Sequence, residues 1–217
     1  MSKIVAIDGP AGSGKGTVAK ILSDKCNLMY IDTGAMYRAI AYLTLKNNID
    51  IKDKEKIVEL AKNAKIEFID GKTFLNDIDI SKEIRTMEVS SIVSPISSIV
   101  KLREILVDLQ RKMAGNNDVI MEGRDITTVV FPNATYKFYL DAKIEERAKR
   151  RYKENLEKGM EVSFDEILEN IKKRDYNDMH KEVGSLTRTE DAIYIDSTNL
   201  SIEEVVEKMK NIIEVTK

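Results

Sequence analysis

A glycine-rich run directly behind a short apolar segment limits the possible folds of this chain more than any other feature. Residues 4–8 form the apolar segment, and a helix-like pattern runs from Thr17 to Lys25. The run itself consists of Gly9, Pro10, Ala11, Gly12, Ser13, Gly14, Lys15, Gly16 and Thr17. A strand, a glycine-rich loop and a helix in this order predict a phosphate-binding P-loop, because glycines let backbone N–H groups surround phosphate oxygens. We expect Lys15 to face solvent within this cradle and to reach the β- and γ-phosphates of a nucleotide.

The residue after the lysine departs from the strict P-loop pattern. That pattern has Ser or Thr directly after the lysine, whereas this chain has Gly16 there and moves the hydroxyl to Thr17. We therefore expect Thr17 to contact a magnesium ion directly or through a water molecule. The Gly-Lys-Gly-Thr form resembles nucleoside monophosphate kinases more than GTPase switches.

Short apolar runs that end in a polar residue, each followed by a helical pattern, predict a parallel sheet covered on both faces. These runs are residues 4–8, 28–32, 119–122, 136–141 and 193–196. Two helix starts carry capping boxes, Ser163 with Glu166 and Ser201 with Glu204. Because ligands bind at the carboxyl ends of parallel strands, polar residues at those ends are candidates for the site.

Residues 48–94 interrupt the alternation of strands and helices. A short amphipathic helix leads into two strand-like runs, 66–69 and 73–75, with Asp70 and Gly71 between them. Asp-Gly between two such runs favours a hairpin turn, because glycine adopts the positive φ that the turn requires. The sequence therefore predicts a small α+β insert on the α/β core.

Two further segments hold charged residues near expected strand ends. Thr33 can cap the helix that carries Arg38, which suits a second phosphate or is an ordinary cap beside a solvated arginine. Arg124 can pair with a phosphate and Asp125 can accept from an amino group such as that of cytosine, or the two can form a loop salt bridge.

Two helices also carry charged residues at informative spacings. Arg147, Arg150 and Arg151 fit a lid that stabilises a transferring phosphoryl group, a basic patch or a solvated face. Arg174, Asp178 and Lys181 share one expected helix face, where they can hold a ribose and a phosphate or form an exposed charged stripe. His180 lies off that face and receives no role.

Composition excludes several classes of protein. A formal net charge of −2 argues against a protein that works on nucleic acid through a basic field. One cysteine excludes an internal disulfide framework, and one histidine excludes most histidine-based metal sites. Because no apolar run approaches the ~20 residues that span a bilayer, we expect a cytoplasmic protein with no membrane partner.

Taken in order, the motifs resemble those of bacterial-type cytidylate kinases, nucleoside monophosphate kinases of the P-loop class. The matching segments are residues 7–17, 32–38, 83–86, 123–125, 128–132, 174–175 and 196–198. The resemblance implies an α/β fold with a P-loop NTPase core of five parallel strands, ordered 2-3-1-4-5 and flanked by helices, a small α+β NMP-binding insert and a short lid. The core would be residues 1–38 and 97–217, with a lid at about 152–163 and the CMP-binding insert at 39–96.

The resemblance also implies an activity, the transfer of a phosphoryl group from ATP to CMP or dCMP with Mg²⁺. It assigns ATP to the nine P-loop residues, the metal to Thr17 and the chemistry to Lys15, Arg124, Arg147 and Arg151. Its CMP-binding residues are Thr33, Arg38 and Arg124 for the phosphate, Ser94, Arg103 and Asp125 for the cytosine, and Arg174 and Asp178 for the pentose.

Two positions differ from the usual family pattern. Thr33 stands where serine is frequent and keeps the hydroxyl. Lys181 stands where arginine is frequent, and because lysine lacks the two-pronged fork of arginine, we assign it no contact.

Three other functions remain open at this stage. Another P-loop kinase would use AMP, UMP, shikimate or dephospho-coenzyme A as acceptor. A GTPase switch would carry Asn-Lys-x-Asp, which does not occur, and a nucleic-acid-binding ATPase would use Lys149, Arg150 and Arg151 as a phosphate track. We expect a monomer that acts on ATP and CMP or dCMP, with no nucleic-acid partner.

Overall fold

The computed structural model describes residues 2–69, 71–157 and 159–215, and the chain divides into two compact units. The first unit comprises Met1–Tyr30 and Asn116–Lys217, and the second comprises Ile31–Gly115. The second unit therefore contains all of the expected insert, 39–96, and extends beyond it on both sides.

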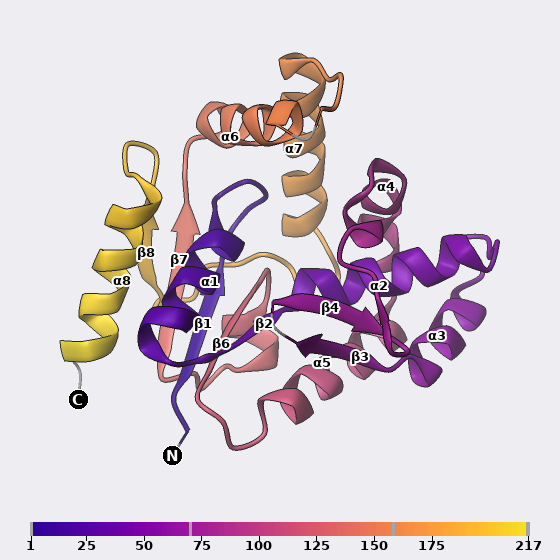
Figure 1. Ribbon diagram of the computed structural model, residues 1–217, viewed down its shortest axis with the longest axis horizontal. Helices are drawn as coiled ribbons and strands as arrows, with labels where there is room; N and C mark the ends of the chain where they lie inside the picture. The colour runs from indigo at the N-terminus through magenta and orange to yellow at the C-terminus, as the bar shows by residue number, and fades with distance from the viewer. Residues whose placement is uncertain (1, 70, 158, 216–217) are drawn as a thin grey trace. The chain divides into compact units, whose positions relative to one another are not determined.

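A five-stranded sheet forms the centre of the first unit (Figure 1). Its strands are β1 (Ile4–Asp8), β2 (Met29–Asp32), β6 (Val119–Gly123), β7 (Tyr136–Asp141) and β8 (Ile193–Asp196). The order is β2-β6-β1-β7-β8, which is the predicted 2-3-1-4-5 when these strands are numbered along the chain. β1 runs parallel to both β6 and β7, and β7 runs parallel to β8. β2 leads from the first unit into the second.

Two helices cover one face of this sheet, α1 (Lys15–Cys26) and α8 (Ile202–Val215), as Figure 1 shows. Leu22 of α1, Phe138 of β7 and Val206 of α8 are fully buried in the core between them. Alternate residues of β7, Tyr136, Phe138 and Leu140, point into this core, which is the period-2 pattern of a strand. The predicted capping box of α8 is confirmed by hydrogen bonds between Ser201 and Glu204 in both directions.

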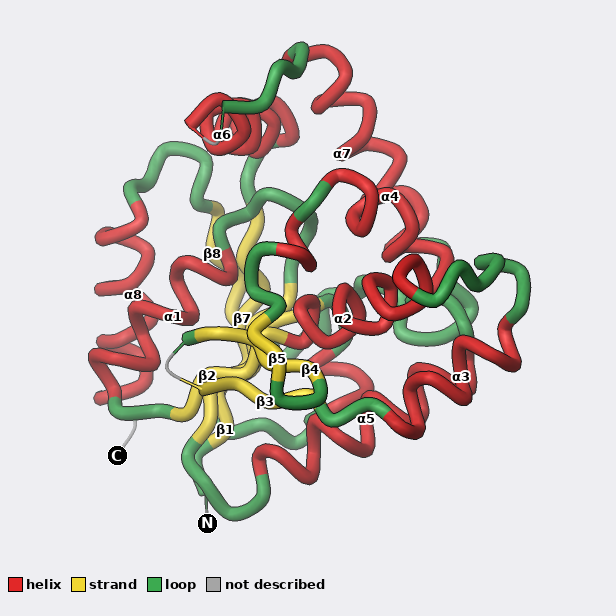
Figure 2. Tube along the Cα trace, turned by 45° about the vertical axis from the view of Figure 1, so that its right-hand side comes forward, coloured by secondary structure: helices red, strands yellow, loops and turns green. Residues whose placement is uncertain are grey.

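The remaining helices of the first unit are η2, a π-helix at Ile126–Val130, α6 (Ile144–Glu157) and α7 (Phe164–Met179). α6 and α7, which are labelled in Figure 2, meet through an apolar cluster in which Ala148, Ile167 and Ile171 are buried. The predicted capping box of Ser163 and Glu166 at the start of α7 is confirmed. Within the expected lid, residues 152–157 continue α6, and residue 158 lies outside the described residues.

The second unit combines helices with a small antiparallel sheet. Its elements are α2 (Thr33–Lys46), α3 (Lys54–Asn63), β3 (Ile66–Ile69), β4 (Lys72–Leu75), β5 (Ile78–Asp79), η1 (Glu83–Arg85), α4 (Met87–Ile96) and α5 (Val100–Ala114). β3 and β4 pair antiparallel as predicted, and β5 adds a strand that the sequence did not indicate. Asp70 of the predicted turn lies outside the described residues, while Gly71 has the expected positive φ of 72°.

None of the helices in the described part of the chain combines the length and apolar character needed to cross a bilayer.

The capping box of α8 can be tested by replacing its serine. Ser201→Ala removes the oxygen that accepts from the Glu204 N–H at 3.2 Å, so we expect it to lower the free energy of unfolding by about 1 kcal/mol. Ser201→Asp keeps a capping oxygen and should leave stability close to wild type. Urea denaturation of both variants checks this, and equal losses in both would contradict the capping role.

Candidate active site

The P-loop joins β1 to α1 and closes around the side chain of its own lysine. Gly14 has a φ of +90°, and α1 begins at Lys15, two residues earlier than the sequence indicated. The Lys15 ammonium donates to the Pro10 carbonyl at 2.9 Å and to the Ser13 hydroxyl at 3.3 Å. Only 5% of the residue is exposed, so the expectation that it faces solvent is wrong. The lysine folds back into the space that its loop encloses.

The buried position of Lys15 lowers the pKa of its side chain. Burial, and next the charge of Arg124, lower the pKa of Lys15 from 10.5 to about 7, although Glu122 and Asp8 act in the opposite direction. The two hydrogen-bond acceptors that it contacts, a carbonyl and a hydroxyl, carry no formal charge. An anion placed in this loop would give the ammonium a charged partner in addition to these two acceptors, which suits a phosphate-binding lysine.

Two glycines of the loop are required by close backbone approach. Gly9 has a φ of +156°, and a Cβ there would lie 2.0 Å from the Leu140 carbonyl oxygen of β7. Gly12 has a φ of +75°, and a Cβ there would lie 3.0 Å from the Arg147 carbonyl oxygen of α6. Since backbone cannot give way as a flexible side chain can, both positions exclude larger residues. The loop is therefore fixed against β7 on one side and α6 on the other.

The start of α1 presents oxygen atoms that suit a hard cation. Thr17 is exposed in the first turn, and a Cβ on Gly16 would lie 3.6 Å from both the Glu122 carboxylate and the Tyr30 hydroxyl. Hydroxyl and carboxylate oxygens are ligands that Mg²⁺ prefers, either directly or through its waters. The space beside Gly16, where the strict motif has its hydroxyl, is thus bordered by other oxygens.

The Gly-Arg-Asp segment begins at Gly123, the last residue of β6, and a buried carboxylate fixes the turn that follows the segment. Asp8, at the end of β1, accepts from the Ile126 N–H at 2.9 Å, the Thr127 N–H at 2.8 Å and the Thr127 hydroxyl at 2.6 Å. Burial raises the pKa of Asp8, and these hydrogen bonds oppose that rise. The Asp125 carbonyl accepts from the N–H groups of Val129 and Val130. The backbone beside Asp125, itself 6% exposed, is therefore held from two sides.

A cluster of cations surrounds Asp178 of α7. Its carboxylate accepts from Arg124 Nε at 2.8 Å and from Lys181 Nζ at 2.8 Å, with Arg174 Nε at 3.9 Å. Although burial opposes ionisation, Arg124 and Lys181 hold the pKa of Asp178 well below its usual range. Lys181 lies beyond the end of α7 at Met179, so the expectation that it shares a helix face is wrong, yet it still reaches Asp178.

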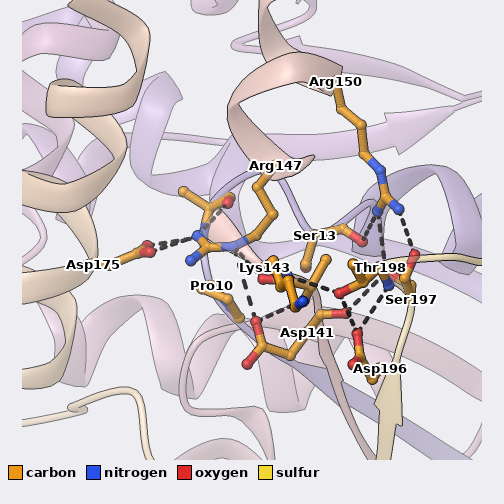
Figure 3. Close-up of polar contacts among 12 residues, drawn as sticks. Pro10, Ser13, Asp141, Lys143, Arg147, Arg150, Asp175, Asp196, Ser197 and Thr198 are labelled. Atoms are coloured by element: carbon orange, nitrogen blue, oxygen red, sulfur yellow. Dashed lines mark hydrogen bonds and ion pairs between the residues drawn. The ribbon is translucent and has the colours of Figure 1, made fainter. Parts of the chain in front are cut away.

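The three arginines of α6 occupy different environments, and Figure 3 shows two of them, Arg147 and Arg150. Arg147 is buried and donates to the carbonyls of Ala11 and Ala142 and to the Asp175 carboxylate. Arg150 donates to the Ser13 carbonyl at 3.4 Å and to Ser197, in the loop after β8. Arg151 has a side chain that is 43% exposed and pairs with Glu154 at 3.0 Å. Two of the arginines thus contact the P-loop backbone and the third lies near solvent.

The second unit carries the remaining predicted residues. Asp32, not Thr33, caps α2 by accepting from the Ala35 N–H at 2.7 Å, so the predicted cap is wrong by one residue. Asp32 also pairs with Arg38, at 3.1 Å.

The other two predicted residues of this unit lie on α4 and α5. Arg103 is 4% exposed, donates to the Ser97 carbonyl and lies 5.6 Å from the centre of the Tyr37 ring. Ser94 is half-buried on α4.

Several residues with clear roles in this geometry were missed by the sequence. Asp8 and Asp175 are buried carboxylates that hold backbone N–H groups, and Glu122 borders the start of α1. Asp8 and Glu122 lie at the ends of β1 and β6, so the position of polar residues at strand ends was an available signal. Asp175 sits mid-helix, where spacing gives no comparable signal.

A parallel sheet with a P-loop after its first strand, a buried lysine in that loop and two arginines bonded to the loop backbone defines the class of P-loop kinases. The profile of the family described as Cytidylate kinase matches residues 5–215. The chain is 52% identical over 205 residues to a cytidylate kinase from Caldanaerobacter subterraneus, covering 94% of this chain and 92% of the other. It is 50% identical over 209 residues to one from Alkaliphilus oremlandii, with 96% of each covered. The chain belongs to the cytidylate kinase family, as its motifs predict.

The fold is also similar to that of a protein with little sequence identity to this chain. A crystal structure of an uncharacterized protein from Eubacterium ventriosum superposes with a TM-score of 0.55 and covers 98% of this chain and 99% of its own. The two sequences are 15% identical, so this likeness concerns the fold alone.

The buried lysine makes the stability of the unliganded protein depend on pH. Because the Lys15 pKa falls to about 7 on folding, the unfolded chain binds more protons between about pH 7 and pH 10, and stability should rise with pH in that window. Lys15→Met should remove this rise and be more stable than wild type by at least about 1 kcal/mol at pH 6.

Urea denaturation at pH 6, 8 and 9.5 measures the effect. Lys20→Met, on the exposed side of the same helix, is the matched control and should retain the wild-type dependence. A Lys15→Met protein that keeps the rise would show that Lys15 is not its source.

Proposed function

We propose that the protein transfers the γ-phosphoryl group of ATP to CMP and dCMP, giving ADP with CDP or dCDP. The observation that carries this proposal is the P-loop with its buried lysine, in a chain about half identical to cytidylate kinases over nearly its whole length. Phosphoryl transfer needs little covalent help from a protein, and the task is to position two polyanions and to balance their charge.

The donor side is the P-loop, residues 9–17. Backbone N–H groups at the start of α1 and the positive end of its dipole favour an anion there. When phosphate oxygens enter, Lys15 exchanges its uncharged acceptors, Pro10 and Ser13, for charged ones, and its pKa returns toward the ordinary range. Lys15 then holds a full positive charge where negative charge accumulates during transfer.

Thr17 and Glu122 would hold Mg²⁺, because they supply oxygen ligands at the start of α1. The ion supplies charge neutralisation and orientation of the donor phosphates. Thr17 takes the place of the hydroxyl that the strict motif has at position 16. Glu122 extends the prediction from sequence, which named Thr17 alone.

The acceptor side comprises the residues that we assign to the phosphate, the cytosine and the pentose of CMP. We assign the CMP phosphate to Thr33, Arg38 and Arg124, and an acceptor phosphate is already an anionic nucleophile, so no histidine base is needed. We assign the cytosine to Ser94, Arg103 and Asp125, and the pentose to Arg174 and Asp178. Arg124 and Asp178 hold each other at 2.8 Å, so one hydrogen bond links the phosphate and pentose assignments.

Arg151 is the α6 arginine assigned to the transferring group. Its side chain is 43% exposed and its partner Glu154 lies on the same helix, so the guanidinium can exchange a surface ion pair for a phosphate at little cost. Arg147, in contrast, is buried and bonds to two backbone carbonyls and to Asp175. The expectations of a monomer without a nucleic-acid partner, acting in the cytoplasm, stay predictions.

The acceptor panel is the direct test of this function. Release of ADP from MgATP is measured with CMP, dCMP, UMP, AMP, GMP and shikimate offered separately. We expect strong turnover with CMP and dCMP. Better turnover with another acceptor would keep the P-loop kinase and reject the cytosine assignments. Tight GTP binding without turnover would indicate a switch.

Asp125→Asn separates base recognition from donor binding. Because the Asp125 backbone carbonyl and Asp8 shape the turn, the substitution should preserve the fold and raise the KM for CMP by about tenfold or more through loss of a charged acceptor. ATP affinity, measured by calorimetry, should stay near wild type. Asp24→Asn, exposed on α1, is the control. Equal losses for CMP and ATP would mean that Asp125 supports the core or the metal.

A further inference from the structure

One residue of the P-loop has both of its backbone polar groups bonded to a single buried ion pair. The Ala11 N–H donates to Asp175 Oδ1 at 3.1 Å, and the Ala11 carbonyl accepts from Arg147 Nη1 at 2.9 Å. The same Arg147 Nη1 donates to Asp175 Oδ2, which closes the group (Figure 3). Arg147 comes from α6 and Asp175 from α7, and each is 6% exposed.

The elements that carry the pair are fixed independently of it. α6 and α7 pack through Ala148, Ile167 and Ile171, and Ala148 follows Arg147 directly. Arg147 Nε also donates to the Ala142 carbonyl at 2.9 Å, in the link between β7 and α6. The backbone of Arg147 is therefore fixed by the packing of α6, and its Nε is fixed by the Ala142 carbonyl. Little conformational freedom is then lost when the guanidinium bonds to the loop.

A second contact shows how closely α6 approaches the loop. A Cβ on Gly12 would lie 3.0 Å from the Arg147 carbonyl oxygen and 3.2 Å from the Arg147 Cβ. Backbone thus meets backbone at the residue next to Ala11. The side chain of Arg147 bonds to Ala11 and is buried, whereas that of Arg151 is 43% exposed.

We propose that Arg147 and Asp175 are a positioning pair that fixes the P-loop at Ala11 for the donor nucleotide. The pair acts on ATP through the loop backbone, and Arg147 does not stabilise the transferring group directly. Because both polar groups of Ala11 are held, the peptide planes on either side of it cannot rotate, and the N–H groups that follow stay aimed at the phosphates. This inference rests on the proposed function only in taking ATP as the donor.

Calorimetry of ATP binding to the full chain, without any acceptor, tests the pair. Arg147→Lys keeps the charge but cannot bond to Ala11, Ala142 and Asp175 together, and Asp175→Asn keeps the size but removes the charge. Each should raise the Kd for ATP about tenfold or more, as expected for hydrogen bonds to charged groups. The KM for CMP should change much less. Lys149→Met and Glu169→Gln, exposed positions on the same two helices, are the controls.

A double variant separates positioning from stability. Arg147→Met with Asp175→Leu removes both buried charges, so its thermal midpoint should recover relative to either single variant. Its ATP affinity should stay low, because Ala11 still lacks its partners. Recovery of ATP affinity together with the midpoint would overturn the proposal, as would unchanged ATP affinity in both single variants or equal weakening for ATP and CMP. A wild-type protein that binds ATP but phosphorylates no pyrimidine nucleotide would contradict the proposed function. The ATP affinities of the variants would still test the positioning pair in that case.

Discussion

Polar side chains buried beside the P-loop are the constraint on which the rest of the site depends. Asp8, Lys15, Arg147 and Asp175 are each at most 6% exposed, and a charge removed from water without partners costs several kcal/mol. In each case part of the compensation comes from loop backbone, such as the Ile126 N–H for Asp8 and the Pro10 carbonyl for Lys15. The contacts that satisfy these side chains therefore also shape the loops, and a bound phosphate would add a charged partner to the uncharged acceptors of Lys15.

Local patterns were sufficient to predict a parallel sheet covered by helices, whereas the strand order was predicted from the resemblance of the motifs to those of cytidylate kinases. The β7 and β8 bounds and both capping boxes follow from residues within a few positions of each other. The cap of α2 shows the limit, since Asp32 and Thr33 are neighbours that can both cap, and only backbone geometry selects Asp32. Lys181 shows another, because helical spacing held only to Met179, where α7 ends.

The candidate site was less predictable than the fold, because residues of the same type on one helix make different contacts. Spacing alone does not distinguish Arg147, Arg150 and Arg151, because their contacts depend on which side of α6 faces the loop. Asp175 could not be assigned from spacing, since its partner Ala11 is 164 residues away. Gly9 and Lys15 were found because the residues of their motif are contiguous in the sequence, whereas Asp175 was not, since no neighbouring residue marks its contact with the P-loop.

The contacts at Ala11 involve none of its side-chain atoms. Natural variation should therefore treat the three participants differently. Position 11 can drift among small residues, because any of them presents the same N–H and carbonyl. Positions 147 and 175 can change only together, since a lone change leaves a buried charge without its counterpart. Among related chains, correlated exchange should thus mark the two helices, whereas the loop residue that they hold should vary on its own.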